Sequence, residues 1–219
     1  MLSTERHSLS SISTVIVVAW FLVVLAAGLR GAFESGPTRP PLALLVAVVG
    51  PPLIFAGAYR VSRIFRDFVL AIDLRLLTAV QSWRVIGVMF LAFYAFGLLP
   101  GFFAWPAGIG DVAVGVASPF VLLAMLRRSP TWRRQVWWLN VAGLLDFVGA
   151  IGTGTLSSNN SIGLIANGAA GVSLGSLPLS LIPTFAVPLW TIFHIASLLQ
   201  LARMSEAVSA REVAVTPAI

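Results

Sequence analysis

Apolar residues occur along this chain in six long stretches that carry almost no charge, separated by short polar or glycine-rich segments. A helix needs about 20 consecutive apolar residues, at about 1.5 Å of rise each, to cross the hydrocarbon core of a bilayer. The pattern therefore predicts an all-α integral membrane protein, a six-helix transmembrane bundle forming a single domain over residues 1–219. The predicted spans are 11–29, 41–59, 83–100, 111–126, 136–152 and 179–201.

The segment 60–77, between the second and third predicted spans, has a different pattern. Its apolar and polar positions each recur with helical spacing, and they fall on opposite faces. This is typical of a short amphipathic helix that lies in the membrane interface. We expect it to anchor the bundle, and Arg60, Arg63 and Arg66 are candidates for binding anionic lipid headgroups.

Two glycine-rich segments are predicted to be connections on the outer side. Residues 101–111 contain three glycines and a proline in addition to Asp111, so we expect a turn there, with Asp111 capping the start of the fourth span. The alternative for Asp111 is a binding group at the outer mouth. The longer segment 152–178 has six glycines and no charged residue, and we expect it to pack over that mouth.

Composition supports the membrane assignment and excludes several kinds of cofactor site. Hydrophobic residues make up 58% of the chain and charged residues 10%, with a mean hydropathy of +0.95, whereas about a quarter of an ordinary soluble domain is charged. All fourteen basic residues are arginine, so a retinal Schiff base on lysine is excluded. The absence of cysteine excludes a covalent c-type haem and a disulfide.

The arginines are distributed unevenly between the two sides of the predicted bundle. Twelve fall on the side that holds both termini, and only Arg30 and Arg39 fall on the other. Arginine-rich short loops stay in the cytoplasm, so we expect a multi-pass protein of the bacterial inner (plasma) membrane with both termini cytoplasmic. The net charge of +6 then reflects topology, and nucleic acid is not an expected partner. The first apolar segment, at 19 residues, exceeds the about 7 to 15 of a secretory signal, so we expect it to be retained.

Ionisable groups within the spans are the candidates for function, because each costs several kcal/mol in lipid unless it is paired or hydrated. Residue counts place Asp146 about 15 Å, His194 about 10 Å and Tyr94 about 16 Å above the inner boundary, which predicts a shared polar layer. Arg84, beside Trp83, is expected to extend to the inner headgroups or to pair with a carboxylate. Asn140 is expected to form a hydrogen bond between helices.

His194 is open to three interpretations. A neutral imidazole could hold helices together by bonding Asp146, Tyr94 or a backbone carbonyl, or it could share a proton with Asp146 during transport. It could also be the axial ligand of a haem b in an apolar cleft, with His7 the only other histidine in the chain.

These observations predict a membrane protein with an interior polar site that binds or transports a small molecule, coupled to protons. The alternatives are a haem-binding redox protein that uses His194 and a non-catalytic membrane subunit or scaffold, and a homo-oligomer is compatible with each. No catalytic motif is present, which argues against an enzyme.

Overall fold

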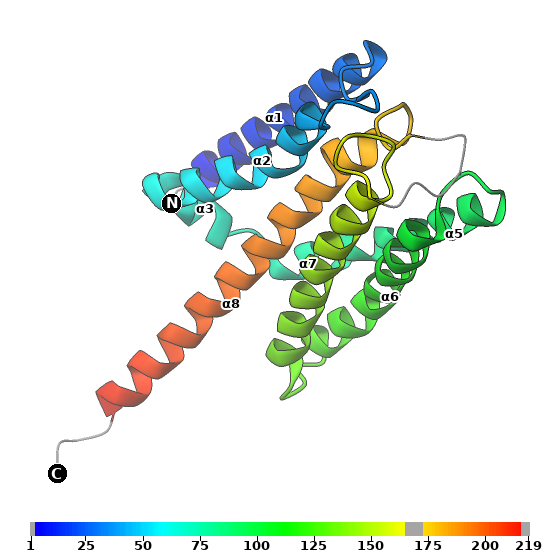
Figure 1. The fold of residues 1–219 in the computed structure, drawn as a ribbon. Helices are drawn as coiled ribbons and strands as arrows, with labels where there is room; N and C mark the ends of the chain where they lie inside the picture. The colour runs from blue at the N-terminus through cyan, green and yellow to red at the C-terminus, as the bar shows by residue number, and fades with distance from the viewer. Residues whose placement is uncertain (1–2, 165–172, 216–219) are drawn as a thin grey trace.

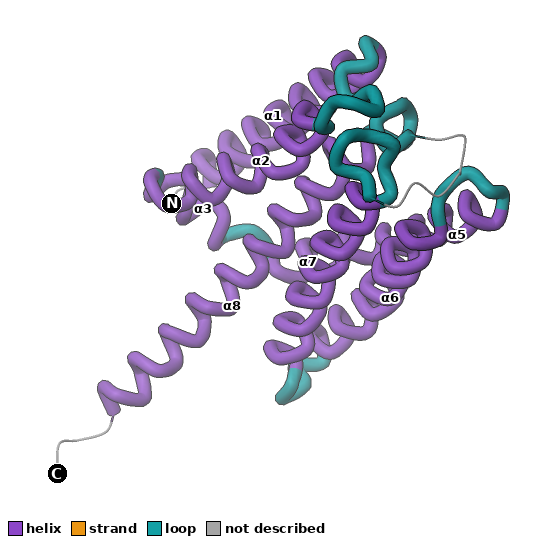
Figure 2. Tube along the Cα trace, viewed as in Figure 1, coloured by secondary structure: helices purple, strands orange, loops and turns teal. Residues whose placement is uncertain are grey.

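The chain folds into a bundle of long helices. The structure is a computed structural model that describes residues 3–164 and 173–215, and these residues form helices and their connections, without strands (Figure 2). Six helical segments are long and apolar enough to cross a membrane, which confirms the predicted six-helix transmembrane bundle. Their bounds are Ser11–Leu29, Leu42–Val61, Leu74–Ala95, Gly101–Leu126, Trp132–Leu156 and Ile182–Glu206.

The helices form two groups with one long helix between them (Figure 1). Helices α1 (Ser3–Leu29) and α2 (Leu42–Val61) lie side by side at one edge, while α6 (Gly101–Leu126) and α7 (Trp132–Leu156) lie at the other. Helix α8 (Val187–Val215) packs on both α2 and α7, and its C-terminal part projects beyond the rest of the bundle.

The third span is assembled from three consecutive helical segments. They are α4 (Leu74–Ala79), a 3₁₀-helical segment η1 (Val80–Gly87) and α5 (Val88–Ala95). The span therefore begins at Leu74, nine residues before the predicted start at Trp83. Polar Thr78 is tolerated inside it because its hydroxyl donates to the Leu74 carbonyl oxygen at 2.9 Å.

The amphipathic helix predicted over 60–77 is shorter in the structure, because two side chains cap new helices within this segment. Ser62 Oγ accepts a hydrogen bond from the Phe65 amide at 3.2 Å and starts α3 (Arg63–Leu70). Asp73 Oδ1 accepts one from the Arg75 amide at 2.8 Å and starts α4. Such caps satisfy amides at a helix start that have no partner within the helix. Helix α3 keeps the predicted amphipathic pattern, with Val69 buried against neighbouring helices.

The predicted outer turn at 101–111 is also wrong, because these residues form the first three turns of α6. Pro100 precedes the helix, and Pro106 and Pro119 lie inside it. The glycines serve close packing instead of a turn: a Cβ on Gly108 would lie 2.8 Å from Leu91 Cγ and 3.2 Å from the Gly87 carbonyl oxygen. Asp111 therefore lies ten residues inside a helix and does not cap one.

The connections define two ends of the bundle (Figure 2). At the loop end lie residues 30–41, 96–100, 157–164 and 173–181, and at the arginine end lie residues 62–73 and 127–131. The predicted long connection 152–178 begins and ends later in the structure, because α7 continues to Leu156 and the last span begins at Ile182. Residues 165–172, which were part of that prediction, lie outside the described residues.

Candidate functional site

Arg84 lies at the centre of a buried cluster of polar side chains. It comes from η1, and its side chain is 3% exposed. Its Nε donates to Asp111 Oδ1 on α6 at 2.7 Å, and its Nη2 donates to Asp146 Oδ2 on α7. One guanidinium thus joins two carboxylates from two different helices.

The other side of the guanidinium contacts α7 and α8. Nη1 lies 3.1 Å from His194 Nε2 and 3.4 Å from the Gly143 carbonyl oxygen. The central carbon of the guanidinium lies 4.0 Å from the centre of the Phe147 ring, within the range of a cation–π contact. Side chains and backbone from η1, α6, α7 and α8 therefore meet at Arg84.

The hydrogen bonds determine the tautomer of His194. Arginine can only donate, so His194 Nε2 must be the acceptor and the ring proton must be on Nδ1. Nδ1 lies 2.8 Å from Asn140 Oδ1 and donates to it, and Asn140 Nδ2 donates to the Val136 carbonyl oxygen at 2.7 Å. The imidazole is therefore neutral, fully buried and bonded at both nitrogens. We call Arg84, Asp111, Asp146, Asn140 and His194 the arginine cluster.

Three members of the arginine cluster, Asp111, Asp146 and His194, differ from the expectation in their bonding, whereas Arg84 and Asn140 each form a contact that was expected. Asn140 forms the predicted bond between helices. His194 bonds Arg84 and Asn140, and not Asp146, Tyr94 or a backbone carbonyl. Arg84 pairs with carboxylates and does not extend to the headgroups, which leaves eleven arginines on the side where twelve were expected.

The cluster lies near the middle of the membrane-spanning part. Arg84, Asp111, Asp146 and His194 are each ten or more residues from either end of their spans. At 1.5 Å per residue they lie about 15 Å or more from both ends. Charges at this depth are tolerated when they are paired, and here the opposite charges are in direct contact.

Small residues allow the four helices to approach closely enough for these bonds. A Cβ on Gly143 would overlap His194 Nε2 and lie 2.7 Å from Arg84 Nη1, and one on Gly110 would overlap the Asp146 carboxylate. Gly115 lets α6 approach η1, since its Cβ would lie 2.5 Å from the Val85 nitrogen. Larger residues at these three positions would separate the helices that hold the cluster together.

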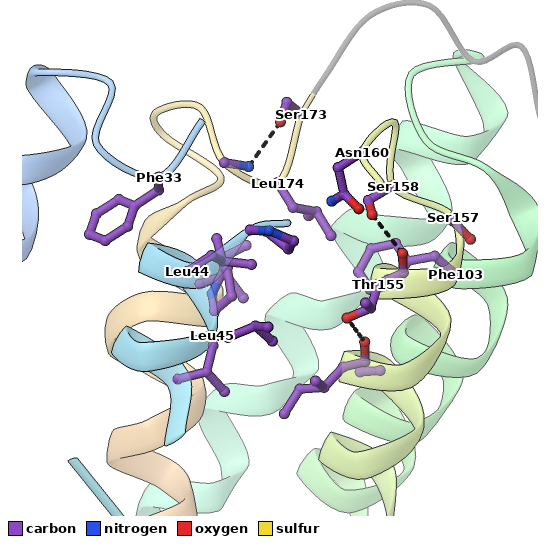
Figure 3. A pocket seen from close by; sticks show the side chains of 18 of the residues that line it. Phe33, Leu44, Leu45, Phe103, Thr155, Ser157, Ser158, Asn160, Ser173 and Leu174 are labelled. Carbon is purple, nitrogen blue, oxygen red and sulfur yellow. Dashed lines mark hydrogen bonds between the residues drawn. The ribbon is translucent and has the colours of Figure 1, made fainter. Parts of the chain in front are cut away.

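A cavity of about 420 Å³ has Asp111 of the cluster among its lining residues. Figure 3 shows the part of its lining at the loop end. Leu44 and Leu45 of α2 line one side and Phe147 and Ile151 of α7 the other. Asp111 also lines it and is 18% exposed, compared with 9% for Asp146 and 3% for Arg84. Of the cluster, Asp111 is therefore the member most accessible from the cavity.

The mouth of this cavity is formed by the described parts of the connection between α7 and α8. Ser157, Ser158, Asn160, Ser173 and Leu174 line it (Figure 3). These residues lie where the sequence predicted a connection packed over the opening, and they provide the cavity's polar rim.

A second cavity, of about 200 Å³, reaches the cluster from the side. It lies between η1 and α5 on one side and the start of α8 on the other, and Arg84, Asp111 and Trp190 line it. Phe147 is shared with the first cavity, as is Asp111. The ion pair between Arg84 and Asp111 is therefore approached by both cavities.

Tyr94 does not belong to the cluster. Its side chain is 42% exposed, and its ring packs edge-on against Trp105 with a centroid distance of 5.8 Å. The predicted depth, counted from Trp83, was wrong because the third span begins nine residues earlier, at Leu74, and ends at Ala95, one residue beyond Tyr94. Tyr94 therefore lies at the loop end of its span.

The surroundings of His194 do not fit an axial haem ligand. Both ring nitrogens are hydrogen bonded, and the side chain lines neither of the two cavities. A haem iron at Nε2 would have to displace the guanidinium that also holds both carboxylates. Within residues 3–164 and 173–215, His, Asp and Glu side chains also form no group of three or more that could hold a metal ion.

Comparison with family models matches residues 41–202 to a domain of unknown function, DUF8737. The matched region contains the second to fifth spans, most of the last span and every member of the arginine cluster. No curated protein and no solved structure matches the chain.

Proposed function

We propose that this chain, which belongs to the DUF8737 family of domains of unknown function, couples binding or transport of a small molecule across the membrane to movement of a proton. The observation that carries the proposal is a buried arginine bonded to two carboxylates at the end of a cavity. The six membrane-spanning helices support a location in the membrane, and the buried charged groups support a role for a proton.

The charges of the arginine cluster support a role for a proton. Arg84 carries one positive charge, His194 is neutral, and Asp111 and Asp146 together carry two negative charges when both are ionised. A net charge at the middle of a membrane costs several kcal/mol, and one added proton removes it. Gain or loss of that proton changes how Arg84 divides its bonds between the two carboxylates, which is a way to link protonation to helix movement.

Buried polar residues continue from the cluster toward the arginine end. Gln81 precedes Arg84 by one helical turn and is fully buried, with no hydrogen-bond partner for its Oε1 among the described residues. Ser118 lies two turns beyond Asp111, bonds the Thr78 carbonyl oxygen at 2.6 Å and lies 3.2 Å from Ser82 Oγ. On the side of the cluster opposite the cavity, these groups are polar sites that a proton could occupy.

Proton flux into liposomes tests this proposal. We expect Asp111→Asn and Asp146→Asn to lower the flux at least about tenfold, because each removes a group that binds the proton in the neutral cluster. The matched control is Asp67→Asn, which changes an exposed carboxylate on α3. Wild-type flux in both cluster variants would refute the proposal, and unchanged flux with lowered thermal stability would support the alternative of a structural subunit.

We further propose the predicted orientation, with the arginine end in the cytoplasm. Exposed arginines gather there, on α3, on the connection between α6 and α7, and at the adjoining helix ends. Arg30 and Arg39 lie at the loop end. The inner membrane of a bacterium is the location that fits this distribution.

Single cysteines test the orientation, because the chain contains no natural cysteine. Asn159 at the loop end and Thr131 at the arginine end are both exposed. We expect a membrane-impermeant maleimide to label Asn159→Cys on intact cells and to label Thr131→Cys only after permeabilisation. The reverse pattern would place the arginine end outside.

Anionic lipids are a proposed partner of α3 through two of the three arginines expected from the sequence. Arg66 is already bonded, since its Nη2 donates to the Arg60 carbonyl oxygen at 2.9 Å and its Nε to the Tyr59 carbonyl oxygen at 3.2 Å. It ties α3 to the end of α2. Arg60 and Arg63 are exposed and remain available to headgroup phosphates.

A further inference from the structure

We propose that the ligand of the loop-end cavity is a monovalent organic cation with an apolar body, which exchanges with the proton of the arginine cluster. This inference rests on the proposed function and specifies its ligand. It depends on the charge of the cavity lining, the composition of its walls and the bonding of its rim.

The charge of the lining favours a cation. Among the described residues, Asp111 is the only charged side chain that lines the cavity, and Arg84 is not among the lining residues. The Asp111 Oδ1 atom bonds Arg84, which leaves Oδ2 for a ligand. A ligand entering from the loop end therefore meets a carboxylate before it can reach the guanidinium behind it.

The walls suit an apolar body that carries positive charge. Phe90, Phe103 and Phe147 line the cavity together with leucine and isoleucine side chains. Phe90 and Phe103 pack edge-on with a centroid distance of 5.3 Å, which fixes the positions of their rings. Aromatic faces attract ammonium groups, and the volume of about 420 Å³ lies within the usual range for small-molecule sites.

Two hydroxyls of the rim already donate within the chain (Figure 3). The Thr155 hydroxyl donates to the Ile151 carbonyl oxygen at 2.7 Å, and the Ser158 hydroxyl donates to the Thr155 carbonyl oxygen at 2.6 Å. Ser157 Oγ is buried and has no partner among the described residues, so it can bond one polar atom of a ligand. The described lining holds no positively charged side chain, so it lacks the charge-assisted donors that bind a phosphate or carboxylate most strongly.

Neutrality of the cluster links the cation to the proton. Either one proton or one monovalent cation at Asp111 balances the second carboxylate, and both together would leave a buried positive charge. Binding of the cation is therefore expected to release the proton. The two species would then cross the membrane in opposite directions.

Binding of three probes to the full chain in detergent tests the ligand class. The probes are benzyltrimethylammonium, its neutral carbon isostere neopentylbenzene, and benzenesulfonate. We expect equilibrium dialysis to show the cation bound most tightly, and Asp111→Asn to weaken its binding about tenfold or more while the neutral isostere binds as before. Asp67→Asn is the control and should bind all three probes as the wild type does.

A second measurement does not depend on the folding of a variant. On addition of benzyltrimethylammonium to wild-type protein in weak buffer, we expect release of about one proton per bound cation, since the cluster exchanges one charge for another. Tighter binding of benzenesulfonate, no binding of the cation, or equal affinity for the cation in Asp111→Asn would overturn the ligand class. Proton flux that persists without cation binding would overturn this inference and leave the proposed function standing. Cation binding without proton release or flux would support the ligand class and refute the coupling.

Discussion

Replacement of Arg84 by methionine is expected to lower the free energy of unfolding by about 3–5 kcal/mol, because it leaves two buried carboxylates without their positive partner. Methionine keeps much of the length of the side chain and removes its charge and donors. Asp111, Asp146 and His194 Nε2 each lose the bond that they make with the guanidinium. Thermal and denaturant unfolding of the detergent-solubilised protein measures the loss.

Restoring the electrical neutrality of the site tests whether unpaired charge causes that loss of stability. When Asp111→Asn and Asp146→Asn are added to Arg84→Met, we expect part of the lost stability to return, since no unpaired charge is left in the site. Arg203→Met is the matched control, because Arg203 bonds Glu206 at 3.0 Å with both side chains exposed, and such pairs contribute about 1 kcal/mol or less. A loss in Arg84→Met no larger than that control would show that the buried ion pairs do not hold the helices together.

The energetic cost of burying polar groups was enough to identify, from the sequence, the residues that the structure brings together. It did not predict which of them bond to each other. Arg84, Asp111, Asp146, Asn140 and His194 were all selected because polar groups within apolar spans need partners. The partners depend on which helices are adjacent and on how each is rotated. Neither follows from the apolar pattern, which specifies only the length of a span and its position along the chain.

The position of Arg84 was missed because the third span starts earlier than its hydropathy suggests. Thr78 and Gln81 precede Arg84 and look like the end of a surface segment, and Trp83 resembles a residue of the membrane interface. In the structure Thr78 and Gln81 bond carbonyl oxygens of their own helix, at 2.9 and 3.5 Å, and are buried. A side-chain donor that bonds a carbonyl oxygen of its own helix, as the Thr78 hydroxyl does, can enter a span without a partner on another helix.

The glycines of α6 led to the wrong prediction of a turn for a related reason. Glycine marks turns in soluble chains, whereas in a membrane bundle it is also the residue that lets helices touch. A helix through 101–111 places Asp111 about three turns deeper than a cap at the surface would, and this depth brings it to Arg84. The sequence did contain a signal for this helix. Gly108 and Gly115 are seven residues apart, which places them on one face of a helix.

Replacement of Gly143 by alanine is expected to disrupt the arginine cluster without changing any of its members. The added Cβ would overlap His194 Nε2 and lie 2.7 Å from Arg84 Nη1, and both side chains are fixed by several bonds. Alanine favours a helix over glycine by about 1 kcal/mol, while overpacking of a filled core costs about 1–3 kcal/mol. We expect a net loss of stability in thermal unfolding, and proton flux lowered as in the aspartate variants.

Gly149→Ala on the same helix is the matched control, because no atom lies within 4 Å of the Cβ that it would add. The gain in helix preference then has nothing to oppose it, so this variant should be as stable as the wild type or up to about 1 kcal/mol more stable, with unchanged flux. Opposite changes in stability for the same substitution, six residues apart, would show that the close approach of α7 to Arg84 and His194 is what the site requires. Equal stability and equal flux in the two variants would mean that the helices can separate at Gly143 without loss, and the cluster would then not depend on its tight packing.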